Sequence, residues 1–132
     1  MKRAIVPILI VAVAVVALVA VPAFGTRVVK FNSKVTVASH DLVFHGKVKS
    51  GSPGCRGGRT VNLKRVFGGG PNQTVGHDVT DSHGRWRIVP QGSAGISLAH
   101  FYAHVRRSSQ GTAGTIYVCR GDSSKIVGAN DN

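Results

Sequence analysis

Residues 80–89, Thr-Asp-Ser-His-Gly-Arg-Trp-Arg-Ile-Val, decide the fold class that this chain can adopt. The first half is rich in turn-forming residues, and Gly84 can take a positive φ without steric cost. The second half alternates in polarity, so that Arg85 and Arg87 face one way and Trp86, the only tryptophan, faces the other. This pattern predicts a strand with one buried face, entered through a tight turn. We expect Trp86 to lie at the centre of a small β-sandwich core.

The rest of the chain has the composition of an all-β protein. It is rich in Gly, Val, Thr and Ser, and its acidic residues are all Asp, which favours short strands and many turns. Turn residues recur about every 8–12 positions, as they do in sandwiches. The chain therefore predicts an Ig-like or prealbumin-like antiparallel β-sandwich of about seven strands. The expected strands of the sandwich are 42–49, 59–67, 73–79, 85–89, 96–98, 101–105 and 115–119, with 34–38 as a candidate edge strand and 124–127 as a candidate last strand. Residues 106–114 are expected to form a polar loop, and Phe44, Val61, Leu63 and Ala103 to surround Trp86.

The N-terminal segment predicts export. Lys2 and Arg3 precede an apolar run from residue 4 to residue 24, and small residues precede a cleavage site after Gly25. Residues 1–25 are thus expected to form an apolar export helix that is a signal peptide, or an uncleaved signal anchor, because the run is long enough to span a bilayer. In either case the positive N-terminus stays inside, so the protein is secreted or anchored to the outer face of the membrane. Residues 26–41 would form an N-terminal extension or edge strand, and residues 42–132 the sandwich.

The two cysteines, Cys55 and Cys119, are expected to form a disulfide. An even number of cysteines in an exported chain favours pairing in the oxidising compartment. The alternative is two free thiols. Two cysteines alone cannot supply a four-ligand structural zinc site.

Several short motifs together resemble a known family. They are Phe44-His45-Gly46-Lys47-Val48, Arg59-Thr60-Val61-Asn62-Leu63 after a loop cysteine, residues 80–86, Phe101-Tyr102-Ala103-His104-Val105 and Cys119. In order and spacing the chain resembles the small exported β-sandwich domains of the carboxypeptidase-regulatory-like and transthyretin-like kind, related in architecture to Cna-B-type surface modules. This resemblance implies a non-catalytic accessory or surface module, with no catalytic residues to carry over. Unlike larger members of that family, this chain is expected to have no enzyme domain attached.

Catalytic and metal-binding patterns are weak. The six histidines match no metal-binding spacing, and Glu is absent. Asp81, Ser82 and His83 are consecutive, so they cannot aim at one another as a catalytic triad does, and the chain has no G-x-S-x-G motif. We expect no enzymatic activity, no metal and no cofactor, with a metal-dependent hydrolase as a remote alternative.

Arg120, Gly121 and Asp122 form an R-G-D tripeptide directly after Cys119. A disulfide at Cys119 would anchor a loop that presents this adhesion motif. The alternative is ordinary turn composition, since Gly-Asp-Ser is common in turns.

The basic excess is the strongest functional signal. The chain carries a formal net charge of +12, and outward-facing basic residues on neighbouring strands would attract polyanions. The candidate cluster consists of Arg59, Arg85, Arg87, Arg106 and Arg107. Aromatic residues do not alternate with these charges, so specific nucleic-acid binding is not indicated; the expected partners are anionic polymers or a membrane surface, and the sequence identifies no protein partner. The alternative is a charged surface with no ligand.

These observations predict an exported, non-enzymatic β-sandwich module with a structural or adhesive role at the cell exterior. The alternative within the same fold is a basic binder of anionic envelope or matrix polymers.

Overall fold

The computed structural model describes residues 25–91 and 98–129, and this part of the chain is built of β-strands, with a 3-10 turn at Pro53–Cys55. The elements are β1 (Arg27–Phe31), β2 (Ser33–Val35), β3 (Ala38–His40), β4 (Val43–Ser50), η1 (Pro53–Cys55), β5 (Thr60–Val66), β6 (Gln73–Val79), β7 (Arg85–Ile88), β8 (His100–Val105), β9 (Ser108–Thr112), β10 (Thr115–Cys119) and β11 (Asp122–Ser123). The expected export helix and most of the expected strand 96–98 lie outside the described residues. Within the described ranges, no helix is long and apolar enough to cross a membrane.

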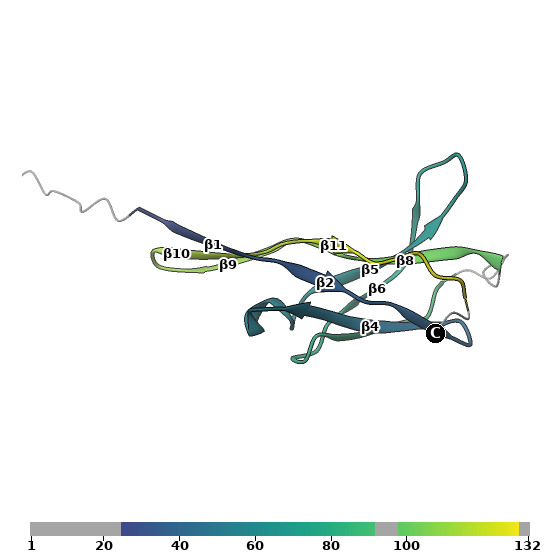
Figure 1. Ribbon diagram of the computed structural model, residues 1–132, viewed down its shortest axis with the longest axis horizontal. Helices are drawn as coiled ribbons and strands as arrows, with labels where there is room; N and C mark the ends of the chain where they lie inside the picture. Colours follow the sequence, from purple (N-terminus) through teal and green to yellow (C-terminus); the bar gives the residue numbers. More distant parts are fainter. Residues whose placement is uncertain (1–24, 92–97, 130–132) are drawn as a thin grey trace, which may run out of the picture.

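The strands form three hydrogen-bonded sheets. In one sheet β4 pairs with β2 and β3 along one edge and with β7 along the other; the second sheet has the order β11-β8-β5-β6, and the third the order β1-β10-β9. Every pair is antiparallel except β1 with β10. Figure 1 shows β4 in the lower layer, β5 and β8 in the upper layer, and the β1-β10-β9 sheet extending from one end. Consecutive short strands are bent continuations of one another, because only one or two residues separate β1 from β2, β2 from β3, β8 from β9 and β10 from β11.

The core lies between the sheet around β4 and the sheet around β5. Trp86 is buried, with 3% of its surface exposed, and belongs to one apolar cluster with all four of its expected neighbours. Contact between the two layers is direct, since the rings of Phe44 on β4 and Phe101 on β8 lie 4.7 Å apart between centroids. The predicted burial of Trp86 is confirmed, and the arrangement is consistent with a β-sandwich. The cluster is made of Val35, Val37, Phe44, Val48, Val61, Leu63, Trp86, Ile88, Phe101, Ala103, Val105 and Val127.

Gly46 makes room for Trp86. The two residues are directly opposite each other on β4 and β7. A Cβ at residue 46 would overlap the carbonyl oxygen of Thr36 and would come within 3.0 Å of the Trp86 ring. Gly46 therefore allows the close approach of both the Thr36 backbone and the Trp86 ring.

The turn before β7 is also formed as its residues predict. Gly84 has a φ of 81°, a conformation that glycine adopts without a Cβ penalty. The Asp81 carboxylate accepts hydrogen bonds from the backbone N–H groups of His83 and Arg85, both at 2.9 Å. This turn places β7 beside β4, with which it pairs.

Three local predictions differ from the structure. The strand expected at 124–127 is absent: β11 is Asp122–Ser123, and Val127 forms only an isolated bridge with Phe101. Residues 108–112, expected to lie in a polar loop, form β9 and pair with β10. Leu42, expected as the first residue of the strand 42–49, instead lies in the two-residue turn between β3 and β4, with a φ of 63°. The segment expected as an extension or edge strand supplies β1, β2 and β3, of which β2 and β3 lie along one edge of β4.

Candidate anion-binding face

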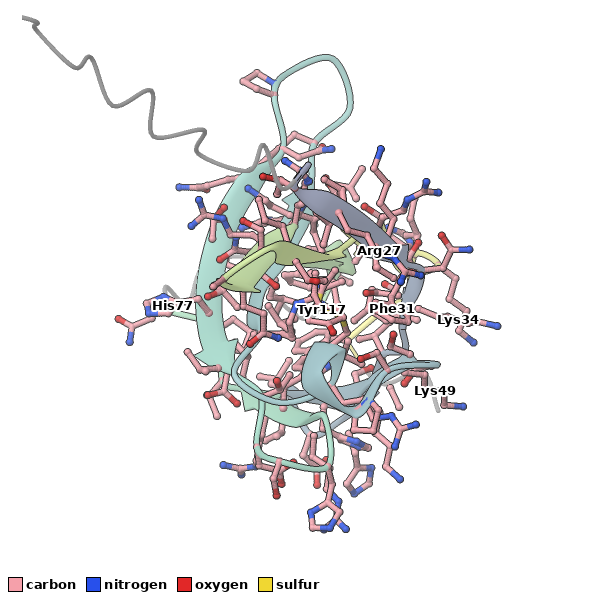
Figure 2. All side chains as sticks on the ribbon, turned by 90° about the vertical axis from the view of Figure 1, so that its left-hand side faces the viewer. Arg27, Phe31, Lys34, Lys49, His77 and Tyr117 are labelled. Atoms are coloured by element: carbon pink, nitrogen blue, oxygen red, sulfur yellow. A yellow bond between two sulfur atoms is a disulfide. The ribbon has the colours of Figure 1, made fainter. Side chains whose placement is uncertain are left out.

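Six basic side chains lie on the outer surface of the sheet that contains β2, β4 and β7. In each strand they alternate with core residues; in β7, for example, Arg85 and Arg87 are exposed whereas Trp86 and Ile88 are buried. Figure 2 shows Lys34 and Lys49 projecting together on one side of the molecule, with His77 of the other sheet on the opposite side. We call this surface the cationic face; its members are Lys34, His45, Lys47, Lys49, Arg85 and Arg87.

The strand register places these basic residues directly opposite one another. Lys34 on β2 is paired with Lys49 on β4. On the other edge of β4, Lys47 is paired with Arg85 and His45 with Arg87. Like charges directly opposite each other in antiparallel strands are destabilising. Electrostatic interactions between these opposed basic side chains therefore do not stabilise the sheet.

The nearest carboxylates are used to hold the backbone. Asp78 accepts hydrogen bonds from the backbone N–H groups of Val79 and Arg87, both at 2.8 Å. The hydrogen bond from the Arg85 N–H, together with that from His83, lowers the pKa of Asp81 below its ordinary value, although desolvation opposes the shift. The ion pair between His40 and Asp41, at 3.2 Å, involves no member of the cationic face. The cationic face is thus left without a neutralising ion pair in this part of the chain.

Two adjoining hollows lie on the cationic face. The first has a volume of about 550 Å³ and is bounded by β4, β7 and the end of β6. The second has a volume of about 260 Å³ and lies between β4, η1 and the turn before β7. Lys47 lines both, so the hollows are neighbours along β4. The first is lined by His45, Gly46, Lys47, Asp78, Val79, Asp81, Arg85, Trp86 and Arg87, and the second by Lys47, Val48, Lys49, Ser50, Arg56 and His83.

Arg59 does not belong to the surface cluster in which it was expected. Only 1% of its surface is exposed. Its guanidinium donates hydrogen bonds to the Ser33 hydroxyl and to the carbonyl oxygens of Cys55, Arg106 and Arg120, at 2.7–3.0 Å. A group held in this way is not available to an external polyanion. The sequence did contain a signal of burial, because Arg59 has the same strand parity as the core residues Val61 and Leu63.

The other four expected arginines are divided between two places. Arg85 and Arg87 lie on β7 in the cationic face. Arg106 and Arg107 are exposed in the connection between β8 and β9, on the sheet that contains β5. Sequence reasoning missed Lys34, Lys47, Lys49 and His45 as candidates. The alternation of residues 45, 47 and 49 could have identified part of this set.

Cys55 and Cys119 form a disulfide, with their Cα atoms 5.4 Å apart. The bond connects η1, which follows β4, to the end of β10. A disulfide of this kind is consistent with an oxidising, extracellular environment.

The R-G-D tripeptide does not form a projecting loop. Arg120 and Gly121 lie between β10 and β11, and Asp122 is the first residue of β11, where it pairs with Val105 of β8. The carboxylate of Asp122 accepts a hydrogen bond of 2.9 Å from the backbone N–H of Val35, and the Arg120 guanidinium donates one to Asn32. Both charged groups of the motif therefore have hydrogen-bond partners within the fold.

The histidines are not gathered into a metal-binding cluster in the described part of the chain, where no three His, Cys, Asp or Glu side chains are close enough to hold an ion.

Comparisons of the chain with protein-family models, with curated proteins and with solved structures found no match. The cationic face is therefore the feature of the molecule that indicates a function.

Proposed function

We propose that this protein is an exported, non-enzymatic binding module whose cationic face holds anionic polymers of the cell envelope or surrounding matrix. The fold that we assign to it is an Ig-like or prealbumin-like β-sandwich, in keeping with the resemblance to regulatory-like and transthyretin-like domains. Binding an envelope polymer is one form of the structural or adhesive role that the sequence predicts.

The observation that carries this proposal is the register of like charges on β2, β4 and β7. Cross-strand pairs of opposite charge would favour the sheet, whereas Lys34 with Lys49 and Lys47 with Arg85 oppose it. A bound anionic group can lie between two basic side chains and form charge-assisted hydrogen bonds with both, which offsets the repulsion between them. A charged surface needed only for solubility has no reason to place its cations in opposed pairs.

The test compares the cationic face with the exposed arginine pair on the other sheet. The double variant Arg85→Ser, Arg87→Ser is compared with the matched double variant Arg106→Ser, Arg107→Ser, which removes the same charge elsewhere. Each is applied to a column of immobilised heparin and eluted with salt. Because bound cations release condensed counterions, the first variant should elute at clearly lower salt than the second. Equal elution of the two variants would mean that only net charge matters, and the proposal would fail.

A further inference from the structure

The shape of the cationic face selects among anionic partners. A flat array of cations suits a plane of charge such as an anionic membrane, but this face is hollowed along β7 and beside η1. The two hollows follow β4 from His45 to Lys49, a distance of about 13 Å for an extended strand. Two neighbouring hollows over this length fit an extended chain, whereas a single ion would occupy only one of them.

The two sides of the first hollow differ chemically. The β4 side carries His45 and Lys47, and the floor carries the two arginines of β7. The opposite side, from the end of β6 to the following turn, carries Asp78, Val79 and Asp81. Val79 is 55% exposed although it is apolar. A ligand in this hollow meets cations on one side, and an apolar methyl surface with carboxylates on the other.

The carboxylate side can accept further hydrogen bonds. In the described structure both hydrogen bonds to Asp81 are accepted by Oδ1, which leaves Oδ2 free for an external donor. A carboxylate accepts hydrogen bonds from hydroxyl groups but repels anionic ones. The hollow therefore suits a chain that has anionic groups along one edge and hydroxyl groups along the other.

From this asymmetry we infer that the two hollows are the binding track for an anionic glycan, a sugar chain bearing sulfate, phosphate or uronate groups. The inference rests on the proposed function and specifies the ligand of the same face. The anionic groups lie between the opposed cations of β4 and β7. The sugar hydroxyls face Asp81, and the ring carbons contact Val79.

The experiment fills the first hollow without changing its charge. Val79→Trp places a large side chain on the carboxylate side, and Val28→Trp, at a residue on β1 that is 51% exposed, is the matched control. Binding of a heparin oligosaccharide and of vesicles containing anionic lipid is measured by titration calorimetry, after thermal melting shows that both variants are folded. We expect Val79→Trp to weaken oligosaccharide binding by about tenfold or more, to leave vesicle binding unchanged, and Val28→Trp to change neither.

A second variant tests selectivity and remains informative if Val79→Trp does not fold. Asp81→Asn keeps the Oδ1 acceptor of the turn and removes the negative charge. Polyphosphate is charged on all sides, so the Asp81 carboxylate should repel it, and it should bind the wild type more weakly than the oligosaccharide does. In Asp81→Asn the difference between the two binding affinities should be smaller. Equal or tighter binding of polyphosphate to the wild type would overturn the glycan assignment.

The two levels of the proposal fail in different ways. If Val79→Trp binds the oligosaccharide as well as the wild type while Arg85→Ser, Arg87→Ser loses it, the cationic face binds polyanions but the track is wrong. A loss of vesicle binding equal to the loss of oligosaccharide binding in Val79→Trp would favour a membrane surface as the partner. If the double arginine variant has no effect on either ligand, the proposed function itself is wrong.

Discussion

Arg59 shows how a single buried cation can organise several segments. Its partners are one hydroxyl and three carbonyl oxygens, none of them ionised. Burial lowers the pKa of its guanidinium, and that group still stays protonated because Arg titrates far above physiological pH. The hydrogen bonds of this residue therefore offset a desolvation cost that no counter-charge reduces.

We predict that Arg59→Met is strongly destabilising. The methionine would keep much of the apolar stem but would leave the carbonyls of Cys55, Arg106 and Arg120 without this donor. Each unsatisfied buried polar group costs about 1–3 kcal/mol, so the free energy of unfolding should fall by about 3 kcal/mol or more. Urea denaturation measures the change, with Arg107→Met, at an exposed position, as the control. Similar unfolding midpoints for the two variants would contradict the role assigned to Arg59.

We expect Asp81 to make the stability of the folded protein partly dependent on pH. Its pKa is lowered in the folded protein, so its carboxylate favours folding above the pKa of the unfolded chain, about 4. This contribution disappears as the pH falls through the lower, folded pKa. Asp81→Asn keeps an acceptor for the turn but does not titrate. The melting temperature of this variant should fall less steeply than that of the wild type below about pH 4, and parallel curves would exclude the effect.

At the scale of elements, the turn between β3 and β4 contains two residues in an unfavourable conformation. Asp41 and Leu42 have φ values of 48° and 63°. Two-residue hairpins with both values positive favour Asn-Gly at these positions. Leu42 gains little in return, since its side chain is exposed.

Replacing Asp41-Leu42 by Asn-Gly should therefore stabilise the protein. The gain should be about 1 kcal/mol, because the new residues adopt the required backbone angles without strain. The exposed ion pair of Asp41 with His40 is a small loss by comparison. Thermal melting measures the change, and Leu42→Ala, which keeps a Cβ at a positive φ, serves as the comparison. A melting temperature no higher than that of Leu42→Ala would contradict this account.

Some elements could be predicted from local sequence, and others could not. β7 was predictable because its alternation and its preceding turn both lie within ten consecutive residues. β9 was not predictable, since Ser108–Thr112 has no apolar alternation and becomes a strand by pairing with β10. Arg59 was wrongly predicted to be exposed because it is charged. Its position in the strand, two residues before the buried Val61, indicated the inward face instead.

At the scale of the whole molecule, the candidate site depends on pairings between distant segments. Lys34, Lys49 and Arg85 come from three strands, and only the register of those strands brings them onto one face. Alternation predicts which residues share a face of one strand, but it does not predict which strand lies beside which. The basic character of the surface was thus foreseeable from the net charge, whereas its location was not.

The disulfide and Arg59 hold the same two segments together. The disulfide connects η1 to the end of β10. The Arg59 guanidinium bonds the carbonyl of Cys55 itself and that of Arg120, the residue after Cys119. The disulfide and the Arg59 hydrogen bonds therefore both hold η1 close to the segment that connects β10 to β11.

This shared attachment predicts that their contributions to stability are not additive. Replacing both cysteines by serine removes a cross-link over a separation of 64 residues, which should cost on the order of 4 kcal/mol. Once η1 is released, Arg59 loses part of its acceptor set even in the folded state. The cost of Arg59→Met should then be smaller in the serine background than in the wild type, with a coupling of roughly 0.5–3 kcal/mol. A double-mutant cycle by urea denaturation measures this coupling. The pair Arg107→Met and double serine should show none, and strict additivity for Arg59 would mean that the two devices stabilise separate parts of the molecule.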